Sequence, residues 1–108
     1  MVQINEIDVH SLKHKLDNNE DFILLDVREN QELEICKIEQ ALHIPMGVIP
    51  ARLNEINFTK TIVVMCKSGG RSAQVCQYLT DQGYSNLYNL RGGITSWALE
   101  IDPQMNTY

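Results

Sequence analysis

The chain has 108 residues, a length that suits one domain, and its apolar fraction of 44% is ordinary for a globular protein. Its formal net charge of −5 disfavours nucleic acid and anionic membranes as partners, because both reward clustered Lys and Arg. No apolar run has the length of a membrane span, and the sequence does not open on a secretory signal. We therefore expect one cytoplasmic domain over residues 1–108.

The first half of the chain alternates helix-like and strand-like segments. Apolar residues recur at helical spacing over 9–16, directly after Asp8, a residue type that caps helix N-termini. The apolar run 22–27 predicts a buried strand. A short acidic helix around 33–35 and a shorter strand at 41–44 complete this half.

The second half continues the same alternation. It predicts, in chain order, a helix at 50–56 with Pro50 in its first turn, a strand at 61–65, a helix at 72–79 stopped by Gly83, a strand at 86–90 and a helix at 94–98. Near-continuous apolar strands alternating with helices are typical of an α/β domain with a mostly parallel sheet. We expect residues 102–108 to form a loosely ordered tail.

The strongest predicted strand runs directly into Cys66, and the next helix begins near Arg71. Cys66 thus lies at the carboxyl end of a parallel strand, where open α/β sheets bind their ligands. Gly69 and Gly70 allow the backbone to curl, so that several N–H groups and the helix N-terminus form an anion cradle in an exposed loop. With Lys67 and Arg71 nearby, we expect the pKa of Cys66 to fall from about 8.5 to about 6.5. The thiolate would then carry sulfur as a persulfide.

The other two cysteines predict no second reactive site. An odd number of cysteines, without any Cys-x-x-Cys pair, argues against a disulfide framework and against zinc binding. Cys76 has the helical spacing of a core residue. Cys36 is ambiguous, because it is either incidental or a resolving partner for Cys66. The acidic residues around Glu32 are interpreted as a solvated helix face.

The spacing between Cys66 and Arg71 separates two chemistries. Cysteine phosphatases have one residue more between the cysteine and the arginine, and their wider loop wraps a tetrahedral phosphate. The tighter loop here favours a sulfur atom. A phosphatase or arsenate reductase that uses the same thiolate is the less favoured alternative.

Four motifs together resemble those of the rhodanese-like sulfurtransferase family over nearly the whole chain. They are Leu25-Asp26-Val27-Arg28, Ile44-Pro45, Cys66-Lys67-Ser68-Gly69-Gly70-Arg71-Ser72 and Leu90-Arg91-Gly92-Gly93-Ile94 with Trp97. The resemblance implies a five-stranded, mostly parallel sheet with helices on both faces. It also implies sulfane sulfur transfer through a persulfide on Cys66, with Lys67, Ser68, Gly69, Gly70, Arg71 and Ser72 forming the anion-binding loop and Asp26 and Arg28 supporting it. We expect no metal and no cofactor.

Two segments, 44–53 and 102–108, look like a subgroup in which the domain is fused to a ubiquitin-activating-like adenylyltransferase. In that subgroup the domain delivers sulfur for thiamine or molybdopterin synthesis. The resemblance leaves open two kinds of acceptor for this chain. One is a thiol or cyanide, with thiosulfate or a persulfide as donor. The other is a partner protein, either a small sulfur carrier or an adenylyltransferase. The family's usual Gly-His-Ile is replaced here by Cys36-Lys37-Ile38.

Overall fold

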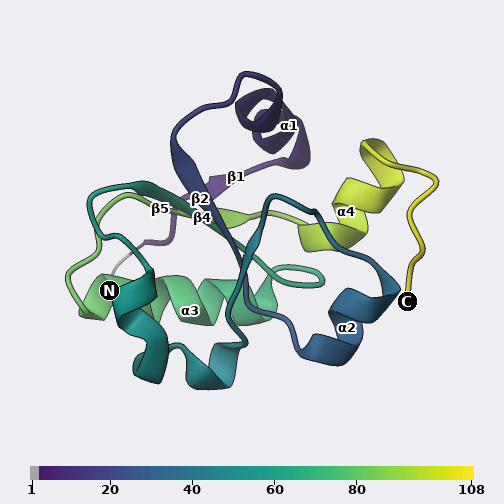
Figure 1. The fold of residues 1–108 in the computed structure, drawn as a ribbon. Coiled ribbons are helices and arrows are strands. Elements are labelled where there is room, and N and C mark those ends of the chain that lie inside the picture. Colours follow the sequence, from purple (N-terminus) through teal and green to yellow (C-terminus); the bar gives the residue numbers. More distant parts are fainter. Residues whose placement is uncertain (1–2) are drawn as a thin grey trace.

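Five strands form one sheet in the order β1-β5-β4-β2-β3, and every neighbouring pair is parallel (Figure 1). The computed structural model describes residues 3–108. The strands are β1 (Glu6–Ile7), β2 (Phe22–Asp26), β3 (Leu42–His43), β4 (Thr61–Met65) and β5 (Leu87–Leu90). The α/β fold and the four strands that apolar runs predict are confirmed. β1 was not predicted, because two residues are too short to show any periodicity.

The helical segments follow the sequence pattern closely. They are α1 (Val9–Asp17), α2 (Asn30–Ile35), α3 (Gly70–Asp81) and α4 (Gly93–Glu100), with the 3₁₀ segments η1 (Met46–Val48) and η2 (Pro50–Glu55). The predicted cap at Asp8 is confirmed, since its side chain accepts a hydrogen bond of 2.8 Å from the Ser11 N–H. η2 contains a non-helical residue, Arg52, with φ −118° and ψ 21°, so the segment beginning at Pro50 does not form a regular α-helix.

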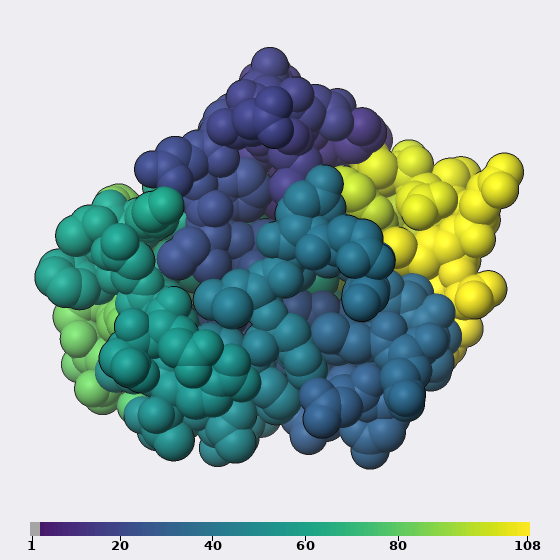
Figure 2. All heavy atoms as spheres, in the orientation of Figure 1, coloured from purple at the N-terminus to yellow at the C-terminus, as the bar shows by residue number. Residues whose placement is uncertain are grey.

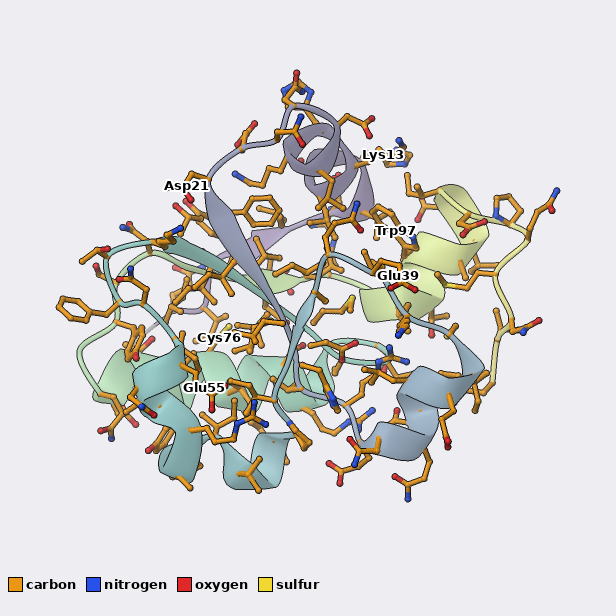
Figure 3. All side chains as sticks on the ribbon, in the orientation of Figure 1. Lys13, Asp21, Glu39, Glu55, Cys76 and Trp97 are labelled. Atoms are coloured by element: carbon orange, nitrogen blue, oxygen red, sulfur yellow. The ribbon has the colours of Figure 1, made fainter. Side chains whose placement is uncertain are left out.

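Helices cover both faces of the sheet and bury two apolar clusters (Figure 1). On one face, α1 and α4 contribute Val9, Leu12 and Trp97 to the first cluster. On the other face, α3 contributes Cys76 and Leu79 to the second. Figure 3 shows Trp97 and Cys76 on opposite sides of the sheet, which confirms the core positions predicted for both residues.

A buried ion pair joins the end of β2 to α2. Arg28 and Asp26 are both fully buried, and the Arg28 Nη2 lies 2.8 Å from Asp26 Oδ2. The same nitrogen donates to the Cys36 carbonyl at 2.9 Å. His43 in β3 contacts the Arg28 carbonyl oxygen through Nε2 at 2.6 Å. Arg28 therefore links β2 to α2 through its guanidinium and to β3 through its backbone carbonyl.

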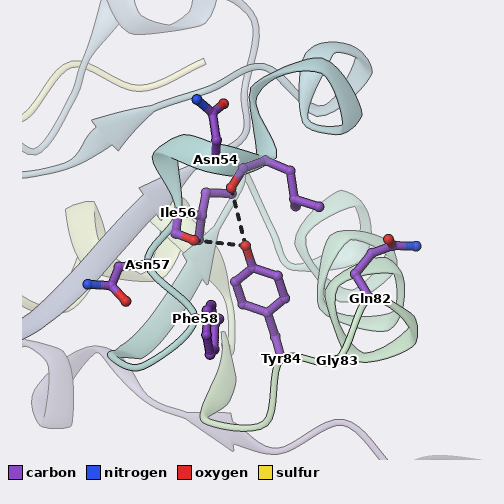
Figure 4. A pocket seen from close by; sticks show the side chains of 8 residues that line it. Asn54, Ile56, Asn57, Phe58, Gln82, Gly83 and Tyr84 are labelled. Atoms are coloured by element: carbon purple, nitrogen blue, oxygen red, sulfur yellow. Dashed lines mark hydrogen bonds between the residues drawn. The ribbon is translucent and has the colours of Figure 1, made fainter.

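An open groove lies at the amino end of the strands, away from Cys66 (Figure 4). Tyr84 closes its floor by donating to the carbonyl oxygens of Leu53 and Ile56 at 3.2 and 2.8 Å. Phe58, which is 66% exposed, lies edge-on to the Tyr84 ring. The residues that line the groove include no cysteine, serine, histidine or acidic side chain. Within residues 3–108, no helix has both the length and the apolar character needed to cross a membrane.

We predict that Asp26→Ala lowers the free energy of unfolding by about 3–5 kcal/mol, because it leaves the Arg28 guanidinium buried without its counter-charge. Urea unfolding followed by circular dichroism measures the loss. Asp21→Ala is the matched control: Asp21 is an exposed partner of Lys60, and its removal is expected to cost less than about 1 kcal/mol. A loss at Asp26 no larger than that of the control would contradict the prediction.

Candidate active site

Cys66 directly follows β4, which lies between β2 and β5, so its position at the carboxyl end of a parallel strand is confirmed. Its Sγ accepts a hydrogen bond of 3.1 Å from the Gly69 N–H and lies 3.2 Å from the Ser72 hydroxyl oxygen. Cys66 is only 1% exposed, although Ser68 and Gly70 face solvent. The expectation of an exposed loop is thus correct for the rim of the loop and wrong for the sulfur.

The two glycines of the 66–72 loop differ in what they contribute. Gly69 has φ +117°, a left-handed conformation that strains any residue with a Cβ, and this conformation lets its N–H turn back to the sulfur. Gly70 begins α3 with ordinary dihedral angles, and a Cβ there would meet nothing within 4 Å. Both glycines leave the backbone free to curl as expected, and the left-handed conformation makes glycine a requirement at position 69 alone.

Burial and hydrogen bonding act in opposite directions on the Cys66 thiol. Burial raises its pKa, since a thiolate loses its hydration. The Ser72 hydroxyl and the backbone N–H groups of Ser72, Gly69 and Ser68 lower it, and their combined effect leaves the pKa below its usual value. The predicted direction of the shift is confirmed. Its main stabilising causes are neutral donors, and the cations are not among them.

The two cations of the 66–72 loop have other partners. Arg71 forms a two-pronged pair with Glu32, with Nη1–Oε1 and Nη2–Oε2 distances of 2.7 and 2.8 Å. Lys67 Nζ lies 4.6 Å from the centre of the Tyr108 ring, a cation–π contact. Glu32 is the first cause of the raised pKa of Arg71, and the charge of Cys66 is a smaller one. Both cations therefore have direct partners other than the thiolate, although the charge of Arg71 still attracts it.

Glu32, in α2, is the acidic residue for which the sequence interpretation is wrong. Its side chain is 17% exposed instead of solvated. Besides Arg71, it accepts hydrogen bonds from the Tyr108 hydroxyl and from the Glu29 N–H. The hydrogen bonds from Arg71, from the Tyr108 hydroxyl and from the Glu29 N–H lower the pKa of Glu32 to about 2, although burial acts in the opposite direction. The carboxylate is therefore fully charged at neutral pH.

Tyr108 brings the 102–108 segment, for which the sequence predicts loose order, beside α2. Its hydroxyl accepts from Arg28 Nη1 at 3.1 Å while donating to Glu32. Figure 2 shows this yellow segment lying directly against the blue atoms of the α2 region. Tyr108 thus contacts Arg28 and Glu32, just before and within α2, and Lys67 in the 66–72 loop, and so joins two distant segments of the site region.

Asn89 in β5 is a site residue that the sequence analysis missed. Its Nδ2 donates to the Gly69 carbonyl at 3.1 Å, which orients the amide so that Oδ1 accepts from the Ser72 hydroxyl. Ser72 has one hydrogen to share. When Cys66 is a thiol, its S–H can donate to Ser72 while Ser72 donates to Asn89. When Cys66 is a thiolate, the Ser72 hydrogen is its natural donor. The sequence does contain a signal for this role, because Asn89 is a polar residue inside the predicted strand 86–90.

The Gly92-Gly93 turn presses the start of α4 against the 66–72 loop. Ile94 and Thr95 donate their N–H groups to the carbonyl oxygens of Cys66 and Lys67, both at 3.0 Å. A Cβ on Gly93 would lie 2.5 Å from the Cys66 oxygen and 2.4 Å from the Lys67 oxygen. Only glycine permits this approach. The turn therefore fixes the backbone that carries the sulfur.

All three cysteines are free thiols. Cys76 is fully buried, and burial raises its pKa to about 12, which agrees with a role in the core. Cys36 lies at the end of α2, with its Sγ 3.9 Å from Arg28 Nη1. Within residues 3–108, no group of three or more His, Cys, Asp or Glu side chains could hold a metal ion.

The chain resembles known proteins in both sequence and structure. Residues 8–100 match the family model described as rhodanese-like domain. A sulfurtransferase from Allochromatium vinosum is 46% identical over 95 residues, which cover 88% of this chain and 89% of that protein. A putative sulfurtransferase from Bacillus subtilis, YtwF, is 40% identical over 103 residues, covering 95% and 99%.

Solved structures and a longer relative extend the comparison. The crystal structure of a rhodanese-like domain protein from Staphylococcus aureus superposes with a TM-score of 0.83 at 31% identity, covering 97% of this chain and 99% of that one. The adenylyltransferase and sulfurtransferase MOCS3 of Arabidopsis thaliana is 27% identical over 120 residues, which cover 96% of this chain and 26% of that protein.

We predict that Ser72→Ala raises the pKa of Cys66, because it removes the hydroxyl that stabilises the thiolate. The rate of iodoacetamide alkylation against pH, read by mass spectrometry on Cys66, measures the shift. Ser68→Ala is the matched control, since it keeps the backbone N–H that faces the sulfur. Coincident pH profiles for wild type and Ser72→Ala would show that the hydroxyl does not stabilise the thiolate.

Proposed function

This chain belongs to the rhodanese-like family of sulfurtransferases, and from that premise we propose that Cys66 accepts sulfane sulfur as a persulfide and passes it on. The observation that carries the proposal is the buried Cys66 Sγ with the Gly69 N–H at 3.1 Å and the Ser72 hydroxyl at 3.2 Å. These donors favour the thiolate, which is the attacking species in sulfur transfer. The donors proposed are thiosulfate or a persulfide.

In the loading step the Cys66 thiolate attacks the outer sulfur of the donor. A sulfur–sulfur bond forms to Cys66 while the bond inside the donor breaks, and the leaving group departs with the electron pair, as sulfite from thiosulfate or as a thiolate from a persulfide. The product is a Cys66 persulfide with one negative charge on its outer sulfur. The N–H groups of the 66–72 loop and the α3 N-terminus favour an anion at this place.

In the unloading step a nucleophile attacks the outer sulfur, and the Cys66 thiolate leaves. The proposed acceptors that react in this way are cyanide, a small thiol or a thiol of a partner protein; the outer sulfur becomes bonded to the attacking atom, and the Cys66 thiolate is regenerated without an oxidant or a reductant. Asp26 and Arg28 act at a distance in this proposal. They hold the ends of β2 and α2, and α2 carries Glu32, the partner of Arg71.

The short 66–72 loop supports sulfur over phosphate as the transferred group. A tetrahedral phosphate needs donors around three oxygens. The Arg71 fork, which would supply two of those donors, is bound to Glu32. Hydrolysis of an aryl phosphate by the wild-type protein, lost in Cys66→Ser, would instead favour a phosphatase or arsenate reductase.

A second candidate is a sulfur-delivery module for thiamine or molybdopterin synthesis. The observation that favours it is the match to the rhodanese-like portion of the longer adenylyltransferase and sulfurtransferase. In this role the acceptor is a partner protein, either a thiol of an adenylyltransferase, which attacks the outer sulfur, or a small sulfur carrier whose diglycine carboxylate has been activated as an acyl adenylate. In the second case the persulfide attacks the acyl carbon, adenylate leaves, and a thiol reductant then splits the acyl disulfide. Transfer to such a carrier that is much faster than transfer to cyanide or small thiols would favour it over the small-molecule enzyme.

We predict that incubation with thiosulfate or a persulfide adds the mass of one sulfur atom to the wild-type protein and none to Cys66→Ser. Intact-mass spectrometry under non-reducing conditions, followed by peptide mapping, measures the addition. Cys36→Ala is the matched control, because it removes another buried cysteine and is expected to load like wild type. A wild-type protein that gains no sulfur from either donor would overturn the proposed function.

A further inference from the structure

We propose that Glu32 is a specificity-determining residue, a built-in anion that occupies the Arg71 fork and selects against sulfur donors carrying two negative charges. The inference rests on the proposed function and narrows its donor class. It assigns the site to donors with a single charge, namely thiosulfonates and persulfides, ahead of the thiosulfate dianion.

The contacts of the Glu32 carboxylate are those that a bound oxyanion would make. Both of its oxygens are held by the Arg71 fork at 2.7 and 2.8 Å, and the Tyr108 hydroxyl and the Glu29 N–H complete its hydrogen bonding. A guanidinium fork binds a carboxylate and the oxygens of a sulfonate with the same geometry. The place that a sulfonate group would take on Arg71 is thus filled by a side chain of the protein.

This pairing removes the positive charge that a dianion would need. Arg71 is paired with Glu32, whose low pKa keeps the carboxylate ionised at neutral pH. Lys67 Nζ lies over the Tyr108 ring. The sulfur itself is surrounded by neutral donors, the Gly69 N–H and the Ser72 hydroxyl. A donor with a second negative charge therefore approaches a thiolate and a carboxylate while the Arg71 fork is already occupied, and Lys67, held over the Tyr108 ring, is left as the cation of the 66–72 loop without an acidic partner among residues 3–108.

Two small sulfur donors of similar shape differ in charge, so comparing them isolates the effect of the second negative charge. Thiosulfate carries two negative charges, and methanethiosulfonate replaces one of its oxygens by a methyl group and carries one. Both load Cys66 by the same displacement: the thiolate attacks the outer sulfur, and sulfite or methanesulfinate leaves with the electron pair. A difference between them beyond their intrinsic reactivity therefore measures how the site treats the extra charge.

The experiment compares the kcat/KM of the two donors, with cyanide as acceptor, for wild type, Glu32→Gln and Glu32→Ala. Each value is divided by the rate of the same donor with free cysteine thiolate, which removes intrinsic reactivity. Glu34→Gln is the matched control, because it removes the same charge from an exposed position of α2. We expect wild type to prefer methanethiosulfonate by about tenfold or more, the effect of one nearby charge at a partly buried site.

In both Glu32 variants the normalised preference is expected to fall by about tenfold, through faster use of thiosulfate, while Glu34→Gln keeps the wild-type preference. An unchanged preference in the Glu32 variants, or an equal fall in Glu34→Gln, would overturn the proposal. If circular dichroism shows that neither Glu32 variant folds, the wild-type protein still tests the proposal, because a normalised preference near one in the wild type would contradict it. Failure of both donors to load Cys66 would instead refute the proposed function.

Discussion

The structure depends on one constraint, which is that a sulfur anion buried at the end of β4 has to be stabilised by donors fixed before the charge appears. Moving an anion out of water is costly unless hydrogen bonds replace its hydration. Here the Gly69 N–H and the Ser72 hydroxyl supply them. Asn89 holds both of those residues, and the Gly93 turn holds the Cys66 backbone. The residues that carry, hydrogen-bond or position the Cys66 sulfur thus come from the ends of β4, α3, β5 and α4.

A second layer of charges surrounds this neutral cradle. The buried pair of Asp26 and Arg28 and the half-buried pair of Glu32 and Arg71 are linked by Tyr108, whose hydroxyl contacts both Arg28 and Glu32. Arg28 and Arg71 each have an acidic partner, whereas Lys67 lies over the neutral ring of Tyr108. This arrangement separates two tasks. Neutral donors stabilise the sulfur, and the ion pairs hold the elements that carry those donors.

Much of the fold could be predicted because its signals are local. Strands such as 61–65 are continuous apolar runs, and α1 has both its helical spacing and its Asp8 cap. The missed strand β1 has only two residues and exists because it pairs with β5. η2 is irregular because Arg52 leaves the helical conformation. Both failures occur where tertiary contacts or single dihedral angles override a weak local preference.

The sequence by itself determined the place of Cys66 after a strand, the glycine that curls the loop, and the family. These follow from residue types that are close together in the chain. Only the tertiary structure decided which groups stabilise the sulfur and which partners the cations have. The Ser72–Asn89, Arg71–Glu32 and Tyr108–Glu32 contacts join residues 17, 39 and 76 positions apart. The energy of such contacts depends on distances that folding sets, and no local pattern of residues encodes them.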